Sequence, residues 1–388
     1  MCGTEPIEKV TNYTYPGVNF NTNGSMESTM TRLAEKARKA EKAKTLILNA
    51  DNNNPSIKTK LFETTQIPIL TYAGEIRFNR VLKPYFMTTL RKMMMMTQSS
   101  IDPSEFQSVQ YTVKDKVANI TLNRPNRLNA IGIHTPKEIY QSVLLANNDE
   151  NVKVIVLSGK GRAFCSGYDL IDFAQSERGT FGSQKMPWDP YTDYKVMASC
   201  TEAFMSLWKS YKPTVCKVHG FAVAGGSDIA LCCDMVIMAD NAKIGYPPSR
   251  VWGCSTPAMW VYRVGPEKAK RLLFTGDLIT GKEATDMGLV LQSVPEDKLD
   301  DAVDKLVQRM VNVPSNQLFF QKQVINQAVE QMGLSSTQRL ATFLDGMTRH
   351  SPEGVLFQQR AYEAGFKQAV KERDSGDETA WSGPNSKL

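Results

Sequence analysis

The sequence lacks the features that mark membrane-spanning and secreted proteins. Its 388 residues contain no uncharged apolar run that approaches the roughly 18 residues of a membrane span. The N-terminus, MCGTEPIEKV, lacks the basic and then apolar layout of a secretory signal. The seven cysteines show neither C-x2-C spacing nor a regular extracellular framework, and the three histidines are scattered. We therefore expect a soluble intracellular protein with reduced cysteines, no metal ion and no membrane contact.

An excess of basic charge is missing from most of the chain. The net charge is +6, yet residues 1–100 carry 14 Lys and Arg against 8 Asp and Glu, whereas the remainder carries 32 of each. Such asymmetry is typical of a nucleic-acid-binding arm or of a segment with a separate origin. Aromatic and basic residues do not interleave in this basic quarter. We expect no nucleic-acid partner and keep RNA binding as an alternative.

Residues 1–104 are expected to form a separate N-terminal segment. A resemblance to non-LTR retrotransposon reverse transcriptases covers residues 10–90 and rests on four stretches, YPGVNF at 15–20, NGS at 23–25, LAEKARKA at 33–40 and PILTY at 68–72 followed by Glu75. In that family the segment follows the catalytic aspartates. No strand with paired aspartates precedes it here, so the resemblance implies no polymerase activity. Residues 30–44 also have the spacing of a solvated helix, and the two interpretations are compatible.

A periodic α/β pattern begins near residue 107. Alternating strands at 109–113 and 117–122 flank a polar turn and predict a hairpin, and the apolar run 152–157 predicts a buried strand. Strands and helices then alternate, which indicates a parallel sheet with helical crossovers. The further elements expected are helices at 136–146 and 194–209, strands at 214–218 and 235–239, a helix entered at Gly226, and helices at 297–311, 316–332, 336–348 and 352–369. The expected regions are a core at 105–295, a helical region at 296–374 and a disordered tail at 375–388.

Two glycine-rich turns follow predicted strands and carry the chemistry. They read GKGRAFCSGYDL at 159–170 and GFAVAGGSD at 220–228. Glycines let the backbone turn sharply and present amide N–H groups, although each turn alone also fits an ordinary tight turn. Together they can aim two N–H groups at one oxygen, which stabilises an enolate or a tetrahedral oxyanion on a thioester. A Walker A motif is excluded because Gly220-x4-Gly225 is followed by Gly226-Ser227, and no dinucleotide fingerprint is present.

Six blocks between residues 109 and 294 resemble, in order and spacing, the enoyl-CoA hydratase/isomerase (crotonase) family. The blocks are LNRPNRLNA at 122–130, FCSGYDL at 164–170, Lys212-Pro213, GFAVAGGSDIALCCD at 220–234, FTGDLI at 274–279 and ATDMGLV at 284–290. The resemblance implies an α/β crotonase-like spiral of ββα units, followed by helices that form a homotrimer or homohexamer. It also implies an acyl-CoA substrate and no separate cofactor, since CoA is part of the substrate.

The resemblance also implies which residues form the site. By position, the backbone N–H groups of Tyr168 and Gly225 are the oxyanion donors. Arg127 falls where the family has a basic residue near the CoA phosphates, with a solvated loop charge as the alternative. The residues expected to contact CoA are Arg127, Leu128, Ala163, Tyr168, Asp169, Leu170 and Gly225.

Hydratases of this family use two glutamates, and neither is present here. Asp228 occupies the first position and Pro248 the second. Proline cannot act as an acid or a base, so catalysis falls to Asp228, for which stabilisation of a helix N-terminus is the alternative. Tyr246 and Arg250 are further catalytic candidates, because a phenol can donate a proton and a guanidinium can bind a carboxylate; a structural role is the alternative for both.

The expected reaction is hydration of a 2-trans-enoyl-CoA in fatty-acid oxidation. Double-bond isomerisation is the second expected reaction, because moving one proton between two carbons needs only one carboxylate. CoA-thioester hydrolysis and non-catalytic CoA binding are also compatible with these residues. The last three residues, Ser386, Lys387 and Leu388, match the peroxisomal address, so we expect the peroxisomal import receptor as a partner and the peroxisome as the location.

Overall fold

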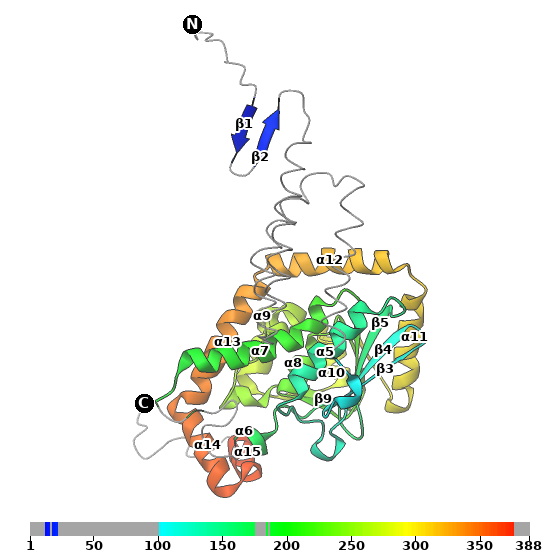
Figure 1. Ribbon diagram of the computed structural model, residues 1–388. Coiled ribbons are helices and arrows are strands. Elements are labelled where there is room, and N and C mark those ends of the chain that lie inside the picture. Colours follow the sequence, from blue (N-terminus) through cyan, green and yellow to red (C-terminus); the bar gives the residue numbers. More distant parts are fainter. Residues whose placement is uncertain (1–11, 16–17, 22–100, 175–183, 185–186, 376–388) are drawn as a thin grey trace. The chain divides into compact units, whose positions relative to one another are not determined.

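The computed structural model describes residues 12–15, 18–21, 101–174, 184 and 187–375 (Figure 1). The chain forms two compact units, Met1–Met93 and Met94–Leu388. In the first unit, β1 (Asn12–Tyr15) and β2 (Val18–Asn21) form an antiparallel hairpin. The expected helix at 30–44, most of the retrotransposon-like segment and the C-terminal tripeptide lie outside the described residues. The expected domain limits therefore stay predictions.

The second unit is built on a six-stranded sheet with the strand order β11-β8-β6-β5-β4-β3. Strands β3 (Val109–Lys114) and β4 (Val117–Leu122) pair antiparallel, and the other neighbours pair parallel. In the turn between β3 and β4, Asp115 and Lys116 have φ values of 49° and 67°. These left-handed values suit the twist of a two-residue hairpin. The predicted hairpin and the predicted parallel sheet are both confirmed.

The sheet is covered by helices, which explains its apolar centre. In β5 (Val154–Gly159) the first four side chains are all buried, as is typical of a parallel strand with both faces covered. Helix α5 (Thr135–Asn148) packs on β3 and β4, and α7 (Pro190–Lys209) packs on α5. Helix α7 starts at Pro190 rather than residue 194, because Asp189 caps it by accepting a hydrogen bond from the Tyr191 N–H at 3.0 Å.

A second sheet of three strands runs in the order β10-β9-β7. Between residues 214 and 275 the chain alternates between the two sheets, placing one strand in each before a helix, as expected for a spiral of ββα units. The first such unit is β6 (Thr214–Val218), β7 (Phe221–Val223) and α8 (Gly225–Leu231), and the second is β8 (Met235–Ala239), β9 (Lys243–Gly245) and α9 (Met259–Thr275). The remaining elements are β10 (Leu278–Thr280), α10 (Gly281–Met287) and β11 (Gln292–Val294).

The chain after residue 295 is helical, as expected, but with one more helix than predicted. The helices are α11 (Leu299–Val311), α12 (Ser315–Gln331), α13 (Leu334–His350), α14 (Pro352–Ala364) and α15 (Phe366–Asp374) (Figure 1). The single helix predicted at 352–369 is wrong, because Gly365 has φ 84° and ψ 147° and breaks it in two. Helix α11 packs on β5, β6, β8 and β11, whereas α13 packs on α7. Among the described residues, no helix combines the length and apolar character needed to span a bilayer.

Candidate active site

The two glycine-rich turns lie against each other. The Cys165 N–H donates to the Phe221 carbonyl at 2.8 Å, and the Cys165 carbonyl accepts from the Val223 N–H at 3.0 Å. A side chain at Gly226 would collide with the Cys165 carbonyl, and a Cβ atom at Gly167 would lie only 2.7 Å from that of Ala224. Only glycine permits this approach at both positions. The predicted convergence of the two turns is therefore present.

Two backbone N–H groups at this junction have no hydrogen-bond acceptor among the described residues. The backbone groups on either side of the Tyr168 N–H already form hydrogen bonds. The Gly167 carbonyl accepts from the Ile131 N–H at 2.8 Å, and the Asp169 N–H donates to the Ile131 carbonyl at 3.0 Å. Within the described part of the chain, the Tyr168 N–H has no acceptor. Gly225 is the first residue of α8, where an N–H lacks an intrahelical acceptor. A Cβ atom at Gly167, the residue before Tyr168, would lie 3.5 Å from the Gly225 nitrogen, so the first turn passes close to the Gly225 N–H.

Asp228 lies one helical turn beyond these amides and is 4% exposed. One carboxyl oxygen, Oδ1, accepts a hydrogen bond from the Ser255 hydroxyl at 2.5 Å. Burial raises the pKa of Asp228 to about 8; the Ser255 hydrogen bond opposes this rise and the Asp345 carboxylate adds to it. At pH 7 the carboxyl group is therefore largely protonated, and it can give up or take a proton near physiological pH.

Tyr246 lies in the same buried region as Asp228. A Cβ atom at Gly253 would lie 3.4 Å from the Tyr246 hydroxyl oxygen and 3.7 Å from Oδ1 of Asp345, so the hydroxyl and that carboxylate lie near the same backbone atom. Burial raises the pKa of Tyr246 well above its usual range, with a further rise from Asp228 and then Asp345. The phenol is therefore a proton donor throughout the neutral pH range. Its catalytic role stays a prediction.

Pro248 and Arg250 belong to the short helix η3 (Pro247–Arg250). The Arg250 guanidinium donates to the Thr275 carbonyl at 2.7 Å and to Asp374 at 2.9 Å, and it lies 3.7 Å from Asp277. These contacts join η3 to the end of α9 and to α15, which gives Arg250 a structural use. Its expected role toward a substrate carboxylate stays a prediction.

Apart from Gly225, the residues expected to contact CoA lie in the glycine-rich turn at 159–170 or in the loop that includes Arg127 and Leu128. Arg127 is half-exposed, and its guanidinium lies 4.0 Å from Asp169. Asp169 is buried, caps the short helix α6 (Leu170–Phe173) and forms an ion pair with Arg124 at 2.9 Å, so its carboxylate already has partners. Leu128, Ala163 and Leu170 lie on the same loops, where the Leu128 carbonyl accepts from Ser166, Ala163 is buried and Leu170 packs beside Val251.

Two residues that organise these loops were not singled out in the sequence. The Asn129 side chain donates to the carbonyls of Lys160 and Ala163 at 2.9 and 2.8 Å, and Arg124 donates to the Ala130 carbonyl at 2.6 Å. Both lie in the LNRPNRLNA block, which is the signal that could have found them. Ser255 and Asp345 were also missed, and they lie in no recognised block.

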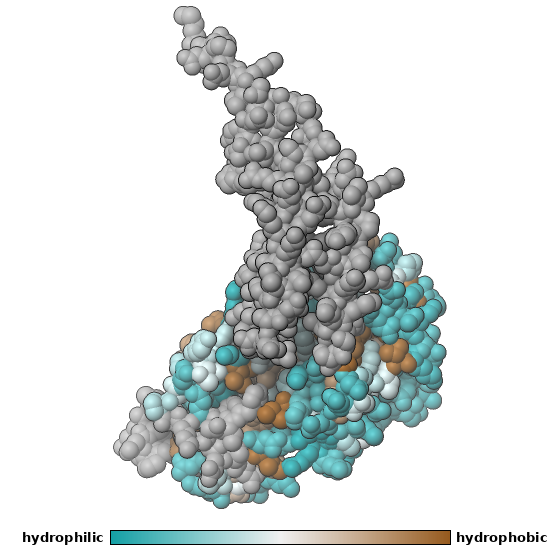
Figure 2. Space-filling model, in the orientation of Figure 1, coloured by the Kyte–Doolittle hydropathy of each residue, from teal (hydrophilic) through white to brown (hydrophobic). Residues whose placement is uncertain are grey.

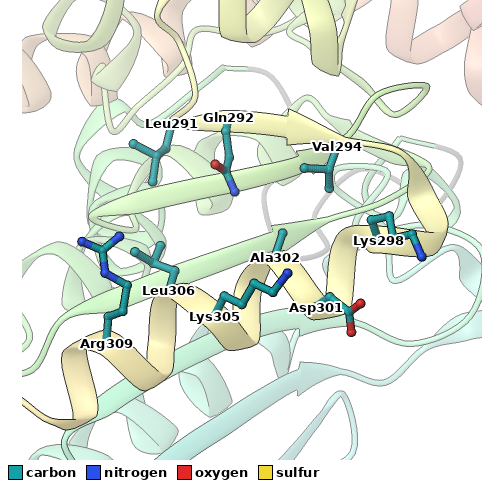
Figure 3. Close-up of a pocket in the computed structure, with 9 residues that line it drawn as sticks. All are labelled: Leu291, Gln292, Val294, Lys298, Asp301, Ala302, Lys305, Leu306 and Arg309. Carbon is teal, nitrogen blue, oxygen red and sulfur yellow. The ribbon is translucent and has the colours of Figure 1, made fainter.

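A separate hollow of about 370 Å³ lies between β11 and α11 (Figure 3). Lys298, Lys305 and Arg309 line it beside apolar side chains that include Leu291 and Leu306. None of its lining residues belongs to the predicted site.

Comparisons with known proteins identify the family of the chain. The family model described as enoyl-CoA hydratase/isomerase matches residues 112–355. A putative enoyl-CoA hydratase of Thermus thermophilus is 32% identical over 64% of this chain and 96% of its own length. The mitochondrial enoyl-CoA hydratase domain-containing protein 3 of Rattus norvegicus is 28% identical over 62% of this chain and 78% of its own.

A solved structure supports the same assignment. The crystal structure of an enoyl-CoA hydratase from Mycobacterium smegmatis is 43% identical and superposes with a TM-score of 0.67, covering 71% of this chain and 96% of that one. The family model spans more than half of the chain and includes both glycine turns, Asp228 and α13. The chain belongs to the enoyl-CoA hydratase/isomerase family.

Proposed function

We propose that the protein hydrates a 2-trans-enoyl-CoA, with Asp228 as the residue that transfers protons. The observation that carries this proposal is a buried carboxyl group with a pKa near 8, one helical turn from the free Gly225 N–H. The thioester carbonyl oxygen would accept hydrogen bonds from the N–H groups of Tyr168 and Gly225. These donors stabilise the negative charge that develops on the oxygen when the thioester becomes enolate-like.

The proton balance of hydration can close on a single carboxyl group. Neutral Asp228 gives its proton to the α-carbon while a water molecule attacks the β-carbon. The resulting carboxylate then takes a proton from that water, which regenerates the acid and leaves a 3-hydroxyacyl-CoA. Ser255 holds one carboxyl oxygen, and the other accepts no hydrogen bond among the described residues, so it is available for these transfers.

Double-bond isomerisation is the second candidate. The observation that favours it is Pro248, which leaves Asp228 as the lone carboxylate of the two family positions. An isomerase needs one base that removes a proton from one carbon and returns it to another. That base would have to start as the ionised carboxylate, whereas hydration as proposed starts from the neutral acid.

For the CoA moiety, we propose that Arg127 approaches the phosphates and that the loop around Leu128, Ala163 and Leu170 borders the pantetheine. The half-exposed guanidinium of Arg127 supports the first part, because a phosphate can reach it from solvent. CoA enters as part of the substrate, and the proposal includes no separate cofactor.

Replacing Asp228 with Asn tests the proton-transfer role. Loss of a general acid should lower kcat by about 10²- to 10⁴-fold, while KM for the enoyl-CoA changes little because Asn keeps the shape and the Ser255 contact. The assay follows loss of the enoyl chromophore and release of free CoA over a panel of enoyl-CoA esters. Equal turnover by both proteins would remove Asp228 from the mechanism, and stoichiometric release of free CoA would indicate a hydrolase.

The pH dependence separates hydration from isomerisation. A neutral Asp228 acid is present below its pKa, so kcat/KM for hydration should fall as the pH rises through about 8. An isomerase needs the ionised carboxylate, which is populated above the pKa, so kcat/KM for isomerisation should rise as the pH increases through about 8. The measurement is a profile of kcat/KM between roughly pH 6 and pH 10 with each substrate class. A flat profile would contradict both roles.

We propose that the chain assembles as a homotrimer or homohexamer through its C-terminal helices. Exposed apolar side chains on α12 and α13 support this proposal. These side chains are Phe320, Val324, Ile325, Leu340, Phe343, Leu344 and Met347. Figure 2 shows hydrophobic patches on one face of the described surface. Sedimentation equilibrium should give three or six times 43.3 kDa, and Val324→Glu should weaken the assembly. A monomer at micromolar concentration would rule the assembly out.

We propose the peroxisome as the location, with import through Ser386, Lys387 and Leu388. The support is the tripeptide alone. Among the relatives described above, one is bacterial and one mitochondrial by name. A fluorescent protein fused to the N-terminus of the full chain should enter peroxisomes, and removal of the tripeptide should leave it outside. Mitochondrial fluorescence in both cases would overturn the proposal.

A further inference from the structure

Three charged side chains are buried between α7 and α13. The Arg349 guanidinium donates two hydrogen bonds to Asp193, at 2.9 and 2.8 Å, and a third to Asp345 at 3.0 Å. All three residues are at most 8% exposed. Burial lowers the pKa of Arg349, but the charges of Asp345 and then Asp193 outweigh this effect and raise it. The three side chains together carry one positive and two negative charges.

Asp345 faces the catalytic residue across one short loop. Its Oδ1 accepts a hydrogen bond from the Cys254 N–H at 2.9 Å, and the next residue, Ser255, donates to Asp228. The loop 253–255 therefore lies between the two carboxyl groups, and each group holds one side of it. Asp193, by contrast, lies on the far side of Arg349 and makes neither contact.

The other titratable groups around Asp228 carry no charge near neutral pH. They are Cys165 and Tyr168 of the first glycine turn, Cys232 at the end of α8, Tyr246 before η3 and Cys254 before α9, and Cys200 on α7 lies beside Tyr168. Burial raises the pKa of every one of these thiols and phenols. Asp345, with its partner Arg349, is thus the charged group that faces Asp228 among the described residues.

Asp345 has a structural use as well, because it accepts the Cys254 N–H and pairs with Arg349, but the first of these contacts needs only a neutral acceptor. A buried ion pair gains little stability over apolar packing, because the cost of desolvating the charges offsets their attraction. The second carboxylate is placed where its charge acts on Asp228.

We propose that Asp345 is a positioning residue for the reaction: from the other side of the loop 253–255, its negative charge adds to the effect of burial in keeping the proton on Asp228. The inference rests on the proposed role of Asp228 as the proton carrier. The C-terminal helix α13, and not only the αβ core, would thereby contribute to the catalytic centre.

Asp345→Asn in the full-length chain tests this inference. Asn removes the charge, keeps an acceptor for the Cys254 N–H and leaves Arg349 paired with Asp193. The first readout is the infrared band of the protonated Asp228 carboxyl group, identified as the difference between wild type and Asp228→Asn and followed with pH. Its midpoint should fall by about one pH unit in the variant. The pH at which kcat/KM for hydration declines should fall by the same amount.

Asp193→Asn is the matched control. It removes the same charge from the same arginine, so it should perturb thermal unfolding similarly but shift the Asp228 midpoint by less than half as much. Asp345→Glu, which keeps the charge, should restore the midpoint. If Asp345→Asn does not fold, Asp345→Ser removes the charge in its place.

Equal shifts in the Asp345→Asn and Asp193→Asn variants, or no shift in either, would overturn the proposal. The infrared midpoint does not depend on activity. An active Asp228→Asn enzyme would refute the proposed function and with it the role of Asp345 in the reaction, whereas an unmoved midpoint refutes the inference alone.

Discussion

The chemistry of this protein depends on the close contact between two backbone turns. Hydrogen bonds between Cys165 and the strand β7 bring the turns together, and the absence of side chains at Gly167 and Gly226 lets them touch. This contact places the Tyr168 and Gly225 N–H groups on adjoining turns. If both bind the thioester oxygen as proposed, they are donors preorganised by the fold, which stabilise a developing charge at no cost of rearrangement.

Local patterns in the sequence predict much of this architecture. The hairpin at β3 and β4, the buried strand β5 and the glycine turns each follow from a few adjacent residues, because strand alternation and glycine freedom act over short distances. The two helix limits that were predicted wrongly also have local causes. Helix α7 starts early because Asp189 caps it, and the last predicted helix divides at Gly365, where the backbone leaves the helical region.

The environment of Asp228 could not be predicted in the same way. Ser255 and Asp345 reach it from a loop and a helix far along the chain, and neither lies in a motif with its own signature. For Arg250 the sequence suggested a catalytic role that the structure does not require. Its sequence position near the second family carboxylate suggested chemistry, yet its guanidinium bonds to Thr275 and Asp374. Such pairings are fixed by tertiary packing, which a single sequence does not record.

Helix α13 has two faces with different uses. One carries Asp345 and Arg349 into the interior, and the other leaves Leu340 and Phe343 exposed. A fragment ending at residue 295 would retain both glycine turns and Asp228, but it would lack Asp345, which accepts the Cys254 N–H beside Ser255. The loop that contacts Asp228 is therefore held in part by a helix outside the ββα core.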